Sequence, residues 1–176
     1  MENKRTQAKV AMTYGSMYGL AAAIIGLIFY FSGADIQSKL PQYISYILLI
    51  IFIVMGVKSY RDQELGGHIS YGKSLGTGVL IGLFGGIITG FFTVLLFTVI
   101  DSGLTQKILE ATQQQMLEKG ISEEQLQTTL KWTRKFMGPI PLFLFSILGG
   151  AFMAFIFSLI ISIFTKKEEN PFSSQL

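Results

Sequence analysis

The chain has 176 residues, of which 50% are hydrophobic and only 14% are charged, and its mean hydropathy is +0.50. A soluble domain carries about 25% charged residues, so this composition excludes an ordinary soluble domain and indicates a multi-pass membrane protein. The formal net charge is +3 with basic residues scattered among loops, which argues against a nucleic-acid surface. There is no Cys and one His, so no metal or cofactor is predicted, although a site built from carboxylates alone stays open.

Two apolar runs near the N-terminus are predicted to span a membrane. Residues 10–34 are an uncharged run long enough to cross a hydrocarbon core of about 30 Å. No small-x-small cleavage motif follows a short apolar core, so a retained helix is favoured over a removed signal peptide. After a short polar turn, Pro41 suits a first helical turn, and residues 42–57 form the second span. Tyrosines near its ends favour the membrane interface.

The third predicted span, residues 74–100, carries glycines at every fourth position. They are Gly78, Gly82, Gly86 and Gly90. Each interior Gly costs a helix roughly 1 kcal/mol relative to Ala, but in lipid such a stripe lets a neighbouring backbone approach closely. Because a four-residue step turns by about 40°, the stripe needs either one partner that crosses right-handedly or two partners that touch successive parts. Chance, or a backbone-lined pathway, is the alternative, since glycine is common in membrane helices.

Small residues recur at the same spacing in two other spans. In the first span they are Ala11, Gly15, Gly19 and Ala23, and in the fourth span, residues 139–165, they are Ser146, Gly150, Ala154 and Ser158. The second span has no such run, so spans one, three and four are predicted to lie in close mutual contact, with span two peripheral. The helix-packing residues predicted in this way are Gly15, Gly19, Gly78, Gly82, Gly86, Gly90, Gly150 and Ala154. Packing within one chain and packing between copies are both compatible with the pattern.

Residues 101–138 are predicted to form an extramembrane helical hairpin. Apolar positions recur every four residues from Leu104, and Gly120 can end that helix in the left-handed conformation. Ser122 is placed as an N-cap with Gln125 at the capping-box position. The second helix combines an apolar side with Lys131, Arg134 and Lys135. Such a hairpin can lie on the membrane or cap the bundle. The whole chain, residues 1–176, is thus predicted to be one all-α integral membrane domain with four spans.

No chemistry-bearing motif is evident. The four predicted spans contain no Asp, Glu, Lys, Arg or His, which argues against proton relays, voltage sensors and ion-coupled carriers. His68 is either a headgroup or pH-sensitive group or, more simply, a solvated loop residue. Glu123 and Glu124 are adjacent, point in different directions and suit a first helical turn. No catalytic residue and no enzyme activity is therefore predicted.

The distribution of Lys and Arg predicts the orientation. With a cytoplasmic N-terminus, the inner segments hold eight of the 14 Lys and Arg residues and the outer segments six. Each inner segment carries two or three, whereas the first outer loop carries one. Both termini are therefore predicted to be cytoplasmic, with Lys166 and Lys167 at anionic lipid headgroups.

Several stretches together resemble one family. They are Gly67-His68-Ile69-Ser70-Tyr71-Gly72, the glycine-rich third span, Leu117-Glu118-Lys119-Gly120-Ile121-Ser122-Glu123-Glu124-Gln125 and Asn170-Pro171-Phe172. Over nearly its whole length the chain resembles the small bacterial membrane proteins catalogued as domain of unknown function 4199. The resemblance implies a four-span protein of the bacterial inner membrane and of unknown activity, and it supplies no site residues.

These observations lead to two hypotheses of function. In the first, the protein is non-enzymatic and acts in the lipid bilayer through glycine-zipper helix packing, with itself as a homo-oligomer or with a membrane-protein partner. In the alternative, it is a pore or carrier for a small neutral or lipid-like molecule, lined by Thr and Ser of the spans. These hydroxyls more often bond their own backbone or a neighbouring helix.

Overall fold

The structure is a computed structural model that describes residues 6–33 and 38–167. Every named element in this part of the chain is helical: α1 (Gln7–Phe31), α2 (Leu40–Ser59), η1 (Tyr60–Glu64), α3 (Tyr71–Leu95), η2 (Leu96–Ile100), α4 (Leu104–Glu118), α5 (Glu123–Phe136) and α6 (Pro139–Thr165). Both η elements are single π-helical turns that extend the preceding α-helix. Four stretches are long and apolar enough to cross a membrane: Gln7–Phe31, Leu40–Glu64, Tyr71–Ile100 and Pro139–Thr165. The chain is thus an all-helical protein with four membrane-span-like helices.

The second helical stretch is longer than the predicted span of residues 42–57. It begins at Leu40 and continues through η1 to Glu64. The charged residues that were predicted to lie in a polar connector after the span therefore belong to the last turns of this helix. Apolarity ends at Val57, but Lys, Arg, Gln and Glu are good helix formers and let a helix continue past the hydrocarbon. The second helical stretch ends at Glu64, shortly before Gly66, which has φ +66°. The predicted span, residues 42–57, is itself free of charge, and the charged residues lie in the helical turns that follow it.

The other spans begin or end within a few residues of their predicted positions. The last helix, α6, has the predicted bounds, and Gly138 is its N-cap with Pro at the start of the helix. The third stretch begins at Tyr71 instead of Ser74. The first begins at Gln7, where the Thr6 hydroxyl accepts a bond from the Lys9 amide, and ends at Phe31. The last residue of the predicted first span, Ala34, lies outside the described residues.

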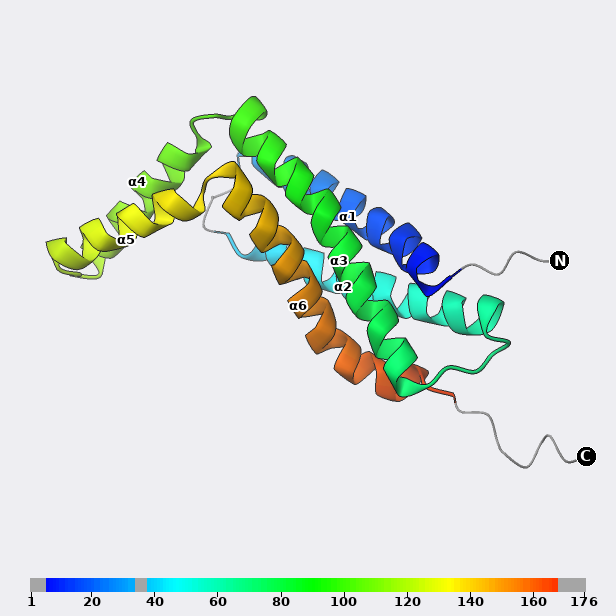
Figure 1. Cartoon of the computed structure of the whole chain (residues 1–176). Coiled ribbons are helices and arrows are strands. Elements are labelled where there is room, and N and C mark those ends of the chain that lie inside the picture. Colours follow the sequence, from blue (N-terminus) through cyan, green and yellow to red (C-terminus); the bar gives the residue numbers. More distant parts are fainter. Residues whose placement is uncertain (1–5, 34–37, 168–176) are drawn as a thin grey trace, which may run out of the picture.

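Helix α3 is the centre of the bundle. It makes its most extensive contacts with α6 and then with α1, whereas α2 contacts α1, α3 and α6 more sparsely. In Figure 1, α3 runs between α1 and α6, and these two helices do not form an extensive contact of their own. The predicted mutual contact of spans one, three and four is therefore corrected, because α6 and α1 pack on different faces of α3. The more sparsely packed α2 follows the prediction.

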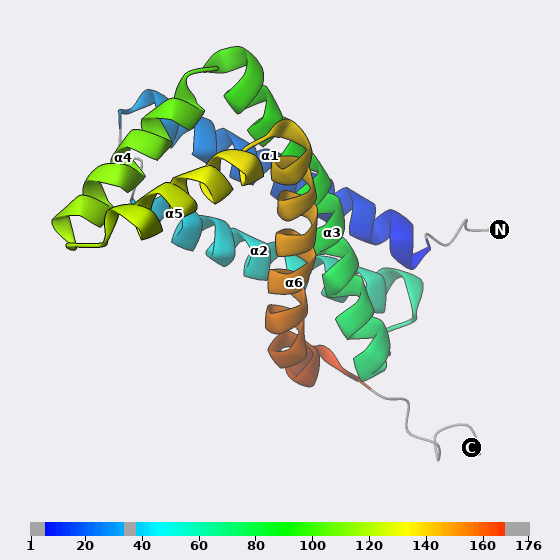
Figure 2. The ribbon, with the colours of Figure 1, turned by 60° about the vertical axis from the view of Figure 1, so that its left-hand side comes forward.

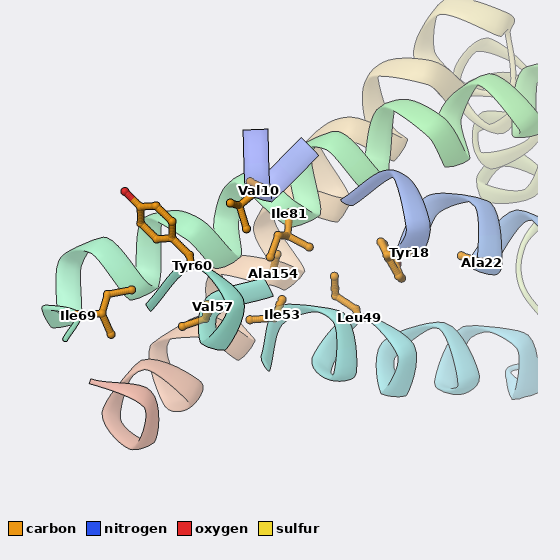
Figure 3. Packing of buried hydrophobic residues seen from close by; sticks show 11 residues of the cluster. Val10, Tyr18, Ala22, Leu49, Ile53, Val57, Tyr60, Ile69, Ile81 and Ala154 are labelled. Atoms are coloured by element: carbon orange, nitrogen blue, oxygen red, sulfur yellow. The ribbon is translucent and has the colours of Figure 1, made fainter. Parts of the chain in front are cut away.

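Large side chains and small ones are distributed as lipid requires. Figure 3 shows the buried cluster, in which Ile53 and Ile81 are completely enclosed next to Ala154. On α6 the buried positions are Ala154, Ser158, Ser162 and Thr165, all of them small. Four of its six aromatic residues are exposed, as at Phe164, which is 82% exposed, whereas Phe143 lies against Gly90 and Phe157 packs on the buried cluster. Lipid tails solvate such side chains, so helices associate through small residues and close backbones.

At one end of the bundle the chain segments are joined by hydrogen bonds. Ile69 and Lys167 form an antiparallel bridge with two bonds of 2.9 Å. The Arg61 guanidinium donates to the Thr165 carbonyl at 3.2 Å, and the Ser74 and Thr165 hydroxyls are 2.8 Å apart. Gln7 donates to the Lys73 carbonyl at 3.1 Å, so the start of α1 lies at this same end. The described ends of the chain therefore lie on one side.

Helices α4 and α5 extend away from the opposite end of the bundle (Figure 1 and Figure 2). The turn between them has Gly120 at φ +66°, with bonds from Gly120 to the Leu117 carbonyl and from Ile121 to the Met116 carbonyl. This is the left-handed helix ending predicted for Gly120. Ser122 is the N-cap of α5, but its side chain makes no capping bond, so the predicted capping box is not formed.

Candidate functional site

All four glycines of the predicted stripe face one helix, α6. Gly78 lies against Ser158, Gly82 against Ala154 and Gly150, Gly86 against Ser146 and Ile147, and Gly90 against Phe143 and Ser146. A Cβ atom on Gly86 would stand 2.6 Å from the Ser146 carbonyl oxygen, closer than the 3.0 Å that real Cβ atoms keep. A single partner therefore follows the whole stripe, and the contact lies within one chain.

A second set of small residues joins α1 to α3. A Cβ atom on Gly15 would stand 2.6 Å from the Ile81 carbonyl oxygen, and one on Gly19 would stand 2.8 Å from that of Gly85. Gly85 itself faces the ring of Tyr18. Sequence reasoning missed Gly85 because it lies beside the four-residue stripe rather than on it. The adjacent Gly85 and Gly86 therefore contact two different helices, α1 and α6.

A cavity of about 510 Å³ lies among all four span helices. It is lined by Tyr18, Ala22, Ala23, Gly26, Leu27, Gln42, Ser45, Tyr46, Leu49, Gly86, Thr89, Phe92, Thr93, Leu96, Phe145, Ser146, Gly149, Gly150 and Met153. None of these lining residues is charged, and the apolar part of the lining exceeds the polar part. The cavity therefore suits a neutral, mainly apolar occupant.

The cavity exists because glycines on two helices leave space beside them that no neighbouring helix fills. A Cβ atom on Gly26 of α1 or on Gly149 of α6 would meet no atom within 4 Å. Both glycines are exposed at the molecular surface, so the cavity is open there. Gly149 and Gly150 are adjacent in the chain, yet only Gly150 touches α3. This opening was not predicted, because a glycine that packs and a glycine that faces a gap look alike in sequence.

The polar groups of the lining are mostly bonded to their own helices. Thr89 donates to the Gly85 carbonyl at 3.1 Å, Thr93 to Thr89 at 2.8 Å and Ser146 to Leu142 at 2.8 Å. On α2, the Gln42 amide nitrogen lies 2.6 Å from the Tyr46 hydroxyl, to which it donates. A hydroxyl whose proton is bonded locally costs little when an apolar group covers it. The Gln42–Tyr46 pair thus places an amide and a phenol hydroxyl next to each other in the lining.

The remaining candidates from the sequence do not line this cavity. His68 is half-buried in the loop between η1 and α3, and Glu123 and Glu124 are exposed in the first turn of α5. Among the residues that the structure describes, no three His, Asp or Glu side chains gather in a way that could hold a metal ion. These residues therefore form no common site.

An ion pair that sequence reasoning missed joins the bundle to α4. The Asp101 carboxylate accepts bonds from Lys107 at 2.7 Å, from the Tyr30 hydroxyl at 2.9 Å and from the Gly103 amide at 3.0 Å. The bond from Lys107, and then that from Tyr30, lowers the pKa of Asp101 below its usual value. The same carboxylate raises the pKa of Lys107. Both charged forms are thus favoured where α1, η2 and α4 meet.

Comparison with known proteins gives one match. A family model described as Protein of unknown function (DUF4199) matches residues 13–167, which include most of α1 and all the later helices. The match agrees with the resemblance drawn from the sequence. No curated protein and no solved structure matches the chain.

Proposed function

Since the chain belongs to the DUF4199 family, whose function is unknown, we propose a function from its geometry. The protein is a non-enzymatic integral membrane protein that binds a small neutral or lipid-like molecule in the cavity among α1, α2, α3 and α6. The observation that carries this proposal is the cavity itself, about 510 Å³ in volume and without a charged lining residue. Sites for small molecules have volumes of about 300–1,000 Å³ and are mainly apolar with a few polar groups.

The chemistry of the lining supports an acyl chain or similar apolar group as the occupant. A charged group placed in this cavity would find no ionic partner among the lining residues, and unpaired charge inside a membrane is costly. An apolar chain meets Leu, Met and Phe side chains and hydroxyls already bonded to their own helices. A neutral polar head group finds Gln42 and Tyr46. Because Gly26 and Gly149 are exposed, the occupant enters from the surrounding lipid.

The assembly hypothesis loses one of the features that motivated it, the glycine stripes. The glycines of α3 already pack on α6, and those of α1 already pack on α3. These stripes are therefore engaged within one chain and are not free to join two copies. We accordingly rank ligand binding above assembly with a second copy or another membrane protein.

The proposal includes location. The protein lies in the inner membrane of a bacterium with both termini in the cytoplasm. The start of α1 and the end of α6 lie at the same end of the bundle, and the excess of Lys and Arg predicted for that side favours the cytoplasm.

The test fills the cavity without disturbing the helix contacts. Gly149→Leu places an apolar side chain at a position where a Cβ atom meets nothing within 4 Å, whereas Gly72→Leu makes the same change at an equally open helical position outside the cavity. Wild-type protein extracted gently from its membrane is examined by native mass spectrometry. We expect a bound lipid-like mass in the wild type and in Gly72→Leu, and its loss in Gly149→Leu without a decrease in thermal stability.

The same experiment separates the hypotheses. Equal amounts of bound molecule in Gly149→Leu and in wild type would contradict binding in this cavity. A defined oligomer or a stoichiometric second protein, with no bound small molecule, would return assembly to first place. Uptake of a neutral solute by vesicles that contain the protein, absent in empty vesicles, would extend binding to transport.

A further inference from the structure

One face of α5 presents aromatic rings beside unpaired positive charges. Trp132 and Phe136 are stacked with ring centroids 5.7 Å apart and are about half exposed. The Lys135 ammonium lies 5.1 Å from the centroid of the Trp132 ring. Lys131 and Lys135 are exposed beside these rings, and neither forms an ion pair within the described part of the chain. Arg134 lies about 200° around the helix from Trp132 and lines a groove against α4. This aromatic–basic face needs a partner that offers both apolar area and negative charge.

The aromatic side of this face continues onto the membrane-span-like helix α6. The Phe136 ring makes a T-shaped contact with Phe145 of α6, at a centroid distance of 5.6 Å. Phe145, Leu144 and Ile140 are themselves more than half exposed. The apolar surface that faces lipid on α6 therefore extends onto α5 without interruption.

The charges of α5 are arranged along its length. The basic residues lie in its C-terminal half, next to α6, whereas Glu123 and Glu124 lie in its first turn at the far end of the α4–α5 arm. Leu126 is 3% exposed, and α5 packs on α4, so the helix has a buried side as well. Trp at the headgroup level and Lys or Arg extended toward phosphates are typical of helices that lie in a membrane interface.

We propose that α5 lies on the bilayer surface, with Trp132 and Phe136 between the acyl chains and Lys131 and Lys135 bound to anionic lipid headgroups. The partner is the membrane itself rather than a soluble protein, because the apolar face is continuous with a helix that lipid already surrounds. This inference does not depend on what occupies the cavity.

The chain carries the probe for its own test, since Trp132 is its only tryptophan. The full chain is placed in nanodiscs of phosphatidylcholine alone or mixed with phosphatidylglycerol. Fluorescence of Trp132 is measured with brominated lipid and with acrylamide as quenchers. Each basic residue near an anionic surface contributes roughly five-fold to docking, so Lys131 and Lys135 together shift the docking equilibrium roughly 25-fold. We expect strong quenching by brominated lipid and weak quenching by acrylamide in the anionic discs, and a smaller difference at high salt.

Variants locate the effect on the α5 face. The double variant K131Q/K135Q is expected to lose the response to phosphatidylglycerol, whereas Lys119→Gln, at the exposed end of α4, keeps it. Circular dichroism confirms that both variants are folded. The proposal is overturned if acrylamide quenches wild-type Trp132 equally in both kinds of disc and brominated lipid does not. That result would assign the face to a partner in water.

Discussion

Adding one methyl group to a glycine has opposite consequences at two positions of the same bundle. At Gly82 a Cβ atom would overlap the Ala154 Cβ and the Gly150 carbonyl oxygen. At Gly149 it would meet no atom within 4 Å. Gly82→Ala and Gly149→Ala therefore differ in environment but not in chemistry. Comparing these two variants therefore separates the effect of helix packing on stability from the effect of helix propensity.

The magnitudes follow from two terms. Replacing Gly by Ala inside a helix stabilises it by about 1 kcal/mol, and this gain applies at both positions. Overpacking costs about 1–3 kcal/mol, and Gly82 lies at the upper end because the opposing atoms include backbone, which moves only if α3 and α6 separate. Gly82→Ala is thus expected to be destabilised by about 2 kcal/mol and Gly149→Ala to be stabilised by about 1 kcal/mol.

Reversible unfolding in mixed detergent micelles, followed by circular dichroism, measures both values in one lipid-like solvent. The wild type and Gly72→Ala, at an open helical position, serve as references. Shifts of the same sign for Gly82→Ala and Gly149→Ala would refute the assignment of Gly82 to a close helix contact.

Three further changes test other contacts. Asp101→Asn removes the ion pair with Lys107, and hydrogen exchange should quicken at the start of α4. Since the pKa of Asp101 is lowered, the wild-type protection should persist above the usual carboxylate pKa and disappear as the pH falls through the lowered one. Ser158→Ala should stabilise the bundle by about 1 kcal/mol in the same unfolding assay, because the buried Ser158 hydroxyl has no bonding partner among the described residues. Gly120→Ala should destabilise the α4–α5 turn by about 1 kcal/mol, seen as faster exchange there, since φ is +66°.

Sequence predicted the elements well where apolarity and chain geometry coincide. Helix α6 has the predicted bounds because Pro139 starts the helix and the apolar run ends at Thr165. The second helix continues past its predicted end because the apolar run and the helical conformation end at different residues. Hydropathy falls at Lys58, but backbone hydrogen bonds continue to Leu65, whose amide bonds the Tyr60 carbonyl. A hydropathy pattern locates the lipid boundary and leaves the helix end undetermined.

The place of the cavity could not be predicted, although Thr89, Thr93 and Ser146, which line it, belong to the span hydroxyls considered as a pore lining. It depends on where neighbouring helices separate, and a single sequence carries no direct record of those distances. Gly26, Gly149 and Gly150 have the same chemistry and similar neighbours along the chain, but only Gly150 lies against α3.

The ion pair between Asp101 and Lys107 was not predicted either. It joins residues six apart across a turn, a spacing for which helical periodicity gives no expectation.

The bundle and its cavity follow from the same property of α6. One side of this helix has backbone and small side chains within reach of α3, so the two helices approach too closely for large residues between them. Most of the large aromatic residues therefore lie on the lipid side, where Phe152 and Phe164 are well exposed. Between these two sides, at Gly149, α6 contacts neither α3 nor a large side chain. Since α2 packs sparsely on α3 and α6, no other span closes that space, and close helix packing itself leaves room for a ligand.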